Sequence, residues 1–264
     1  MADYLFNEFK NRIIISGIVH ALKPICIGAG EEGFEPTHVK SPALKDAHGN
    51  PIIPGSSLKG VLRSSIERII NSFGKDLGLV ACNILEENSK DCLRHANYIE
   101  KIEEKLINIE ESKKTFERAK LVYENSCDVC RLFGGKYIAS KIQIKDLNFN
   151  DKSGARPFCE IRDGIGIDRD TGTTSKGAKF DYEVVPAGTE FEFYMIAENL
   201  DDTQMKLLDL VKSMLQSGEL CVGGKVSRGM GNIKLTITRE KMIQSLEELM
   251  KEYNMRSERV SVDV

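Results

Sequence analysis

Two cysteines in the middle of the chain, Cys127 and Cys130, have the spacing at which a pair of thiolates can hold one metal ion. Three more residues of types that bind zinc precede them: Cys82, Cys92 and His95. A structural zinc site takes four protein ligands. The sequence therefore predicts a structural zinc ion held by four of these five residues, and the alternative is a set of free thiols.

A second segment, 54–60 (PGSSLKG), has residues suited to binding phosphate. Its glycine-serine turn leads into a helical pattern, and the free amides and the dipole at the start of a helix attract anions. Lys59 and Arg63 lie one turn apart on the side of this helix opposite its apolar residues, where they can follow a phosphate chain. An ordinary capped helix with a solvated basic edge is the alternative interpretation.

A glycine loop at 222–231 offers a further phosphate site. Its glycines allow the backbone to approach a ligand closely, while Lys225 and Arg228 supply cationic donors. The spacing does not match that of a P-loop or of a dinucleotide-binding loop. Taken alone, the loop is equally compatible with a plain turn.

The amino-acid composition indicates the class of protein but says little about what the protein binds. The chain has 264 residues, 41% of them hydrophobic, which is enough for a substantial core. Its net charge of -3 gives no reason to expect nucleic acid, so any RNA site must be a local basic stripe. The sequence contains no run of about 18 apolar residues and no secretion signal. We therefore expect a cytoplasmic protein with no membrane partner.

Apolar periodicity predicts the elements that must position these residues. The expected strands are 11–21, 142–144, 191–197 and 233–237, and the expected helices are 58–73, 99–123, 201–216 and 240–253. A serine after Pro54 is expected to cap the first helix, and the residues from 254 onward are expected to be frayed. The core order is strand, helix, strand, strand, helix, strand. It predicts an α+β fold, a ferredoxin-like (RRM-like) βαββαβ sheet covered on one face by two helices.

Six short segments form a further pattern when they are taken together. They are 42–46 (PALKD), 49–53 (GNPII), 54–60 (PGSSLKG), 132–134 (LFG), 180–189 (FDYEVVPAGT) and 224–231 (GKVSRGMG). This set resembles the RAMP superfamily of CRISPR RNA-binding proteins, and within it the repeated backbone subunit of type III effector complexes. The resemblance runs from about residue 13 to 235 and accounts for 74–135 only in part.

The resemblance implies a guide-RNA-binding subunit of a type III CRISPR interference complex, which presents the guide for pairing with target RNA in antiviral defence. Paralogous subunits would stack beside it in a filament. A projecting hairpin, the thumb, would interrupt the guide–target duplex, with Ile165 and Ile167 wedged between bases. A small core under the hairpin is the alternative role for these isoleucines. The residues then expected to contact RNA are Ser56, Ser57, Lys59, Arg63, Arg162, Ile165, Ile167, Arg169, Lys176, Lys179, Gly224, Lys225, Ser227 and Arg228.

The whole chain, 1–264, is then expected to form a single RAMP domain. Its predicted parts are a ferredoxin-like core or palm at 11–73 and 136–239, a helical zinc-binding insertion at 74–135, a thumb hairpin at 158–182, and a C-terminal helix and tail at 240–264.

The loop at 28–46 is where cutting members of this family carry a catalytic aspartate. In this chain the corresponding position is Lys40, and an ammonium cannot ligate a divalent cation. No catalytic residue is assigned, although Glu35 and His38 are candidate substitutes. Two alternatives to a binding subunit stay open. One is a ribonuclease that cuts target RNA with magnesium or manganese in this loop, and the other is a zinc-dependent protein interaction module unrelated to RNA.

Overall fold

The computed structural model describes residues 6, 8–28, 41–82, 92, 96–150 and 159–260, with the backbone alone at 96–98, 176–179 and 255–260. It contains helices and two antiparallel sheets, so the predicted α+β class is confirmed. No helix in the described part of the chain is long and apolar enough to cross a membrane.

The larger sheet has four strands in the order β2-β5-β1-β6. Strand β1 (Arg12–Ala21) lies in the middle, between β5 (Glu190–Glu198) and β6 (Ile233–Ile243), and the short β2 (Ile142–Ile144) pairs with the outer edge of β5. All three pairings are antiparallel. The strands β1, β2 and β5 match the predicted ones closely because their apolar residues alternate with a period of two.

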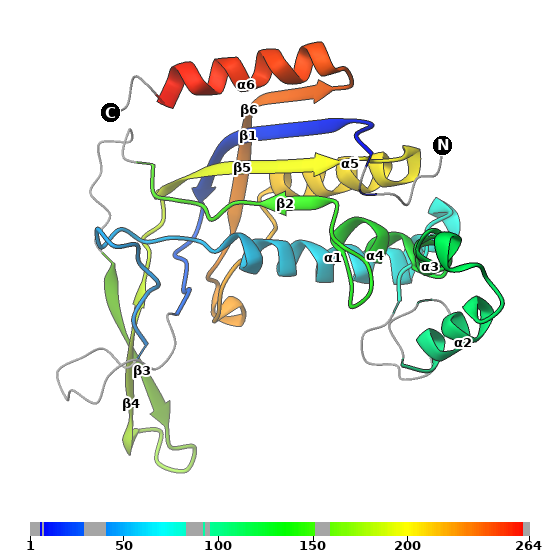
Figure 1. Cartoon of the computed structure of the whole chain (residues 1–264). Coiled ribbons are helices and arrows are strands. Elements are labelled where there is room, and N and C mark those ends of the chain that lie inside the picture. The colour runs from blue at the N-terminus through cyan, green and yellow to red at the C-terminus, as the bar shows by residue number, and fades with distance from the viewer. Residues whose placement is uncertain are drawn as a thin grey trace.

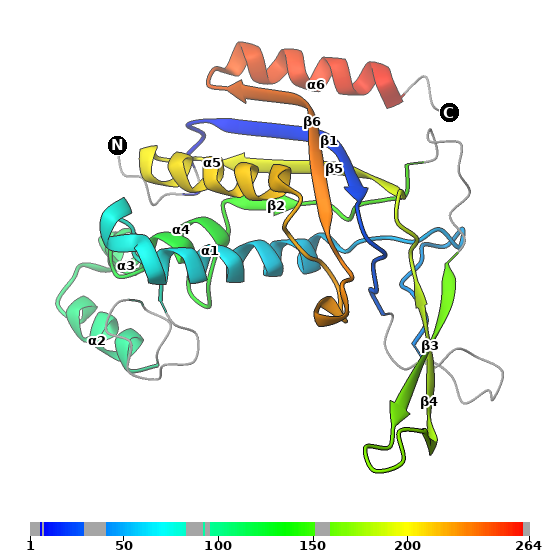
Figure 2. The ribbon, with the colours of Figure 1, turned by 180° about the vertical axis from the view of Figure 1, so that it is seen from behind.

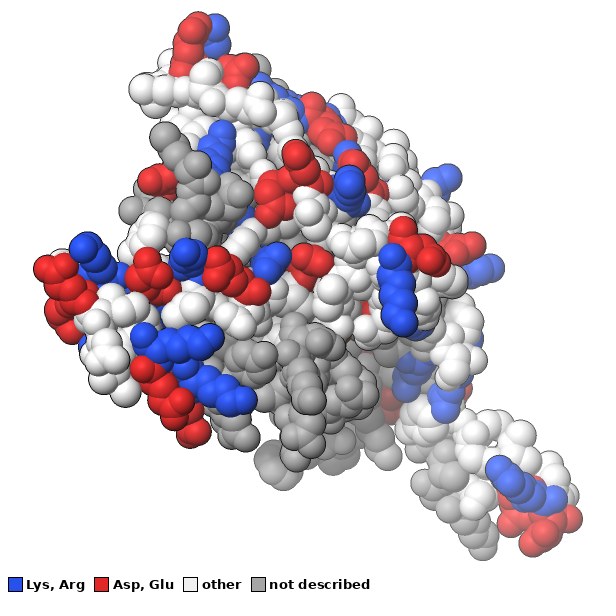
Figure 3. All heavy atoms as spheres, turned by 90° about the vertical axis from the view of Figure 1, so that its right-hand side faces the viewer, with Lys and Arg blue, Asp and Glu red and all other residues white. Residues whose placement is uncertain are grey.

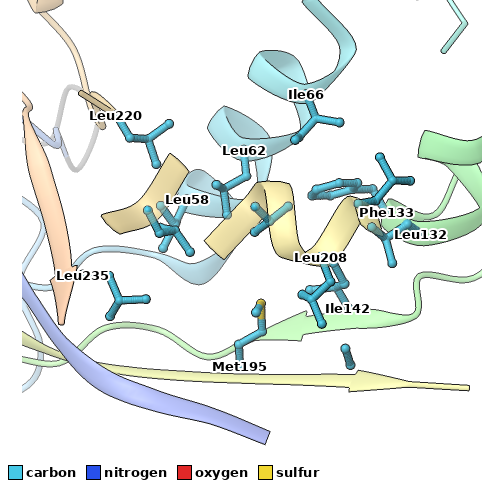
Figure 4. Packing of buried hydrophobic residues seen from close by; sticks show 14 of the residues in the cluster. Leu58, Leu62, Ile66, Leu132, Phe133, Ile142, Met195, Leu208, Leu220 and Leu235 are labelled. Atoms are coloured by element: carbon cyan, nitrogen blue, oxygen red, sulfur yellow. The ribbon is translucent and has the colours of Figure 1, made fainter. Parts of the chain in front are cut away.

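Two helices, α1 (Gly55–Leu77) and α5 (Asp202–Ser217), cover one face of this sheet (Figures 1 and 2). Helix α1 buries Leu58, Leu62 and Ile66 at a spacing of four residues, and these side chains meet the sheet and α5 (Figure 4). Residues at this spacing share one side of a helix. The main core contains Ile13, Ile15 and Val19 from β1, Phe191, Phe193 and Met195 from β5, and Leu207, Leu208, Val211 and Leu215 from α5.

Two additions project from opposite ends of α1 (Figures 1 and 2). At its C-terminal end lie α2 (Ala96–Leu106), α3 (Glu111–Glu124) and α4 (Asp128–Phe133). Near its N-terminal end the hairpin of β3 (Glu160–Ile167) and β4 (Thr174–Val184) extends away from the core. The single helix predicted at 99–123 is wrong, because the chain turns between α2 and α3 and the two helices pack against each other.

The C-terminal part departs most from the prediction. Strand β6 continues to Ile243, and helix α6 (Leu246–Val260) starts six residues later than expected and runs through the stretch expected to fray. The strand is extended because Arg12 to Ser16 of β1 pair with it as far as Ile243. Glu252 of α6 is buried between Arg239 and Lys241 of β6, at 2.7 and 3.1 Å, which ties the helix to the strand.

The N-terminal turn of α1 lies directly against the segment that follows β2. The expected serine cap is wrong: the residue before the helix is Pro54, no side chain caps it, and the amide of Gly55 instead donates to Asp146 at 2.8 Å. This approach is so close that a Cβ at position 55 would lie 2.3 Å from the carbonyl oxygen of Ile144. Only glycine fits there without moving the backbone.

We predict that Gly55→Ala lowers the free energy of unfolding by roughly 1–3 kcal/mol, because the added methyl group overlaps backbone atoms that cannot move independently. Gly60→Ala in the same helix is the matched control, since nothing lies within 4 Å of a Cβ at that position. It should raise stability by about 0.5–1 kcal/mol through helix propensity. Urea unfolding followed by circular dichroism measures both, and equal effects of the two substitutions would contradict the packing argument.

Candidate nucleic-acid interface and metal centre

Four buried cysteines form a compact cluster beside α1. The sulfur atoms of Cys82, Cys92, Cys127 and Cys130 all lie within 4.8 Å of one another, and those of Cys82 and Cys130 are 3.6 Å apart. Sulfurs at the corners of a tetrahedron around a metal about 2.3 Å away are separated by about 3.8 Å. The cluster is therefore able to bind a metal ion. His95, the fifth predicted ligand, lies outside the described residues.

The local sequence explains why these cysteines meet. Cys127 is the N-cap of α4, and its sulfur accepts a hydrogen bond from the amide of Cys130 at 3.4 Å. Val80 and Asp128 exchange two hydrogen bonds, which align the chain before Cys82 with the start of α4. Short helices of this kind place the two cysteines of a C-x-x-C motif on one side, so that both can reach a common ligand.

The thiols influence one another strongly. Hydrogen bonds with Cys127 and Cys130 lower the pKa of Cys92 to about 7. Hydrogen bonds with Cys130 and Cys82 raise the pKa of Cys127 above its usual range. Four thiols this close together cannot all ionise unaided, because like charges in a buried site repel. A divalent cation removes this repulsion and stabilises the thiolates.

The two basic residues predicted on α1 both bond within the protein. The ammonium group of Lys59 donates to the hydroxyl of Ser140 at 2.7 Å and to the carbonyl of Ile142 at 3.1 Å, and burial lowers its pKa. Arg63 is largely buried and points toward the cysteine cluster. Ser56 and Ser57, by contrast, are exposed at the start of the helix. Of the residues predicted to contact RNA on this helix, those of the first turn are therefore the accessible ones.

The glycine loop lies against the base of the β3–β4 hairpin. Gly224 donates its amide to Cys26 at 2.7 Å, and Lys225 adopts a left-handed conformation with φ of 59°. The ammonium of Lys225 lies 4.3 Å from the ring centre of Tyr182 and 5.2 Å from that of Phe180. A cation over an aromatic face is attracted by the ring. Lys225 therefore joins the loop to the hairpin, a contact that the sequence analysis did not foresee.

Exposed donors remain on the same loop. Ser227 and Arg228 belong to a short 3-10 turn (Val226–Arg228) and are both exposed, as is Gly224. The guanidinium of Arg228 lies 5.5 Å from the ring centre of Phe180, which keeps it beside the hairpin base. The loop thus presents a hydroxyl, a guanidinium and glycine backbone on one accessible surface, groups that suit phosphate oxygens.

The β3–β4 hairpin carries large apolar side chains that are mostly exposed. Ile161, Ile165 and Ile167 are 61%, 54% and 64% exposed, and odd-numbered positions of a strand share one face. These exposures exclude the alternative of a small core under the hairpin. Ile161 was missed, although its period-two spacing from the other two could have identified it.

The remaining predicted residues are less informative. Arg162 forms an ion pair with Glu160 at 3.1 Å, and Arg169 is exposed at the hairpin tip. The side chains of Lys176 and Lys179 lie outside the described part. So do Glu35, His38 and Lys40, within the undescribed stretch 29–40. Downstream of them the carboxylate of Asp46 accepts hydrogen bonds from the amides of His48 and Asn50, which closes a turn.

A model of the RAMP superfamily matches residues 18–234, more than four fifths of the chain. The chain belongs to the RAMP superfamily. The RAMP match includes α1, the four clustered cysteines, the hairpin and the glycine loop, and it leaves α6 outside. The chain is also similar to the CRISPR system Cms endoribonuclease Csm3 of Methanocaldococcus jannaschii. The two are 26% identical over 233 residues, which cover 85% of this chain and 79% of that protein.

Proposed function

We propose that this chain is the guide-RNA-binding backbone subunit of a type III CRISPR interference complex, and that it presents the guide for pairing with target RNA in antiviral defence. The observation that carries the proposal is the RAMP match over 18–234, because it includes both predicted RNA-binding segments and the hairpin between them. The similarity to a CRISPR system protein supports the choice of system. A cytoplasmic complex of paralogous subunits, stacked in a filament along the guide, is the proposed setting.

The palm in this proposal is ferredoxin-like. Its support is the order β2-β5-β1-β6 together with two helices on one face, since the βαββαβ connection places the first and third core strands side by side at the centre. The parts stay as predicted: palm at 11–73 and 136–239, insertion at 74–135, thumb at 158–182 and C-terminal region at 240–264. Helix α1 overruns the first boundary to Leu77, and β6 overruns the last to Ile243.

The guide path would follow the exposed groups rather than all the basic ones. Its phosphates would meet the first turn of α1, through Ser56 and Ser57, and the glycine loop, through Ser227 and Arg228. The thumb isoleucines would contact bases. Arg63 is not among the proposed phosphate contacts, because its guanidinium nitrogens already donate hydrogen bonds to groups within the protein.

The net charge of -3 is compatible with this arrangement. Basic and acidic side chains alternate over the side of the molecule that Figure 3 shows, and they do not gather into one field. Attraction to RNA would then be local, supplied by a few donors at the glycine loop and the thumb. Charges farther than about 10 Å away are largely screened at ordinary ionic strength.

The metal in the cysteine cluster is proposed to be zinc. Four thiolates in a compact, closed site favour zinc over harder cations such as magnesium, which prefer oxygen ligands. Bound zinc would supply four metal–sulfur bonds that join the end of α1, position 92 and α4. These bonds would stabilise an insertion whose own apolar cluster is small.

The second candidate function is RNA cleavage, which the name of the Methanocaldococcus relative favours. Against it stands Lys40, which occupies the position of the family's catalytic aspartate and carries the wrong charge for a metal ligand. We therefore propose that this subunit binds guide and target RNA without cutting in the 28–46 loop. Magnesium or manganese would take part only if Glu35 or His38 replaced the missing aspartate.

We predict roughly one zinc per chain in protein purified without chelators, as a closed four-ligand site requires. Cys127→Ser should lower the zinc content and the melting temperature together. Cys159→Ser is the control, because Cys159 lies outside the cluster. Elemental analysis gives the stoichiometry. Wild-type protein with almost no zinc, or equal loss in both variants, would contradict the assignment.

We predict that Arg228→Ala weakens the binding of all guide sequences about equally, since a phosphate contact carries no sequence information. The dependence of log K on log salt should flatten by about 0.7 for the lost contact. Lys113→Ala removes a cation on the exposed surface of α3 and serves as the control. Fluorescence anisotropy of single-stranded RNA at several salt concentrations measures both, and an unchanged slope for Arg228→Ala would remove this residue from the interface.

We predict that the assembled complex with the wild-type subunit does not cut target RNA at this subunit's loop, with either magnesium or manganese. Lys40→Asp should create cleavage, because a carboxylate can hold the cation that activates water. Gel analysis of end-labelled target detects the cuts. Cleavage by the wild type that disappears in a Glu35→Ala, His38→Ala double variant would show instead that these residues act catalytically.

A further inference from the structure

Arg63 makes three directed hydrogen bonds from the middle of α1. Its Nε donates to the carboxylate of Glu67 at 2.8 Å, one terminal nitrogen donates to the carbonyl of Gly134 at 2.8 Å, and the other donates to the sulfur of Cys130 at 3.2 Å. The side chain is only 18% exposed. A guanidinium holds its donors in a rigid fork, so these three acceptors together define its position.

The carbonyl that Arg63 contacts lies at the C-terminal end of α4. Gly134 follows the last residue of α4, and its carbonyl accepts this bond. Its φ is 86°, a positive value that favours glycine. Its amide donates to Cys130 and so closes the helix. Arg63 therefore contacts the carboxyl end of the cysteine-bearing helix and one of its cysteines at the same time. The partial negative charge at that helix end favours a cation.

Charge explains why a cation is needed at this point. A divalent metal with four thiolates has a net charge of minus two, and burying an uncompensated charge is costly. Donors around the sulfurs spread this charge: the amide of Cys127 donates to the sulfur of Cys92, and the amide of Cys130 donates to the sulfur of Cys127. Arg63 adds a full positive charge in direct contact with a sulfur, and its guanidinium stays protonated at any working pH.

We propose that Arg63 is a positioning residue of the metal centre, and that through it the bound metal holds the RNA-binding part of α1 in place. The inference rests on the proposed metal and RNA sites and concerns how they are coupled. Ser56 lies seven residues before Arg63, two helical turns or about 10 Å along the axis. Between them, Lys59 bonds to Ser140 and Ile142 in the segment that follows α4. The stretch 134–142 thus bonds to α1 at both Arg63 and Lys59.

A neighbouring arginine provides the matched control. Arg131 lies beside Cys130 in sequence, yet its guanidinium donates to the carbonyls of Tyr123 and Glu124, at 3.0 and 3.1 Å, and pairs with Asp128. It therefore stabilises the insertion next to a cluster cysteine in sequence, through partners other than the sulfurs. Comparing the two residues separates a direct contact with the metal centre from general support of the fold.

The first experiment measures metal affinity in the full-length protein by competition with a chromophoric zinc chelator. Arg63→Met should weaken zinc binding 10–100-fold, the usual effect of removing a partner of a metal ligand. Arg63→Lys keeps the charge and should recover part of this loss, while Arg131→Met should stay close to the wild type. Cobalt(II) substitution adds a spectroscopic test, because the sulfur-to-cobalt charge-transfer band should shift in Arg63→Met and not in Arg131→Met.

Three results would overturn the proposal. The first two are zinc binding as tight as in the wild type by Arg63→Met or by Arg63→Lys. The third is a loss of zinc affinity in Arg131→Met as large as in Arg63→Met. If Arg63→Met does not fold, Arg63→Lys alone decides, and wild-type affinity in that variant counts against a role for the directed bonds. Wild-type protein that binds neither zinc nor cobalt would refute the metal centre itself, which is a distinguishable outcome.

The second experiment tests the coupling to RNA. Zinc should raise the affinity of the wild type for single-stranded RNA by about 5-fold or more, within the usual range for coupled sites. The RNA affinity of Arg63→Met should be measured both saturated with zinc and stripped of it, and the ratio of these two affinities should be close to one. An equal zinc effect in wild type and variant would overturn the coupling through Arg63. A wild type that binds RNA in neither state would instead refute the proposed RNA-binding function.

Discussion

The burial of one side of α1 is the constraint on which the rest of the structure depends. Leu58, Leu62 and Ile66 are completely buried against the sheet and α5, and full burial of each such side chain stabilises the fold by about 1.5–3 kcal/mol. With that side committed to the core, the rotation of the helix about its axis is determined. The first turn is left at the surface, and Arg63 is turned toward the cysteines. Both proposed sites therefore take their geometry from the same apolar contact.

Much of the four-stranded sheet and of α1 could be predicted because these elements are half buried. Strand β5 alternates core and outer residues along its length, and β1 does so from Ile15 onward. The apolar stripe of α1 repeats every three to four residues, so the period identifies each element. Prediction failed where long-range pairing overrides local preference. The residues after 237 have a helical composition, yet β1 offers them a partner as far as Ile243 and they form strand.

In the candidate sites, too, residue spacing predicted some features and not others. The clustered cysteines could be identified, since a C-x-x-C motif accounts for two of the four and composition suggests the others. The roles of the basic residues could not. Lys59, Arg63 and Lys225 have the residue types of phosphate contacts, but most of their partners come from segments 67 to 83 residues away, or from a separate hairpin, and no local pattern predicts those contacts.

The exposed hairpin affects how readily the free protein aggregates. A two-stranded ribbon with the exposed isoleucines 161, 165 and 167 is a template on which further strands can add. The tip is occupied by Asp168, Arg169 and Asp170, charged residues of the kind that act as gatekeepers against such growth. Newly made chains therefore carry an aggregation-prone surface restrained chiefly by these charges. Their solubility in the cell should depend on how quickly that surface becomes covered.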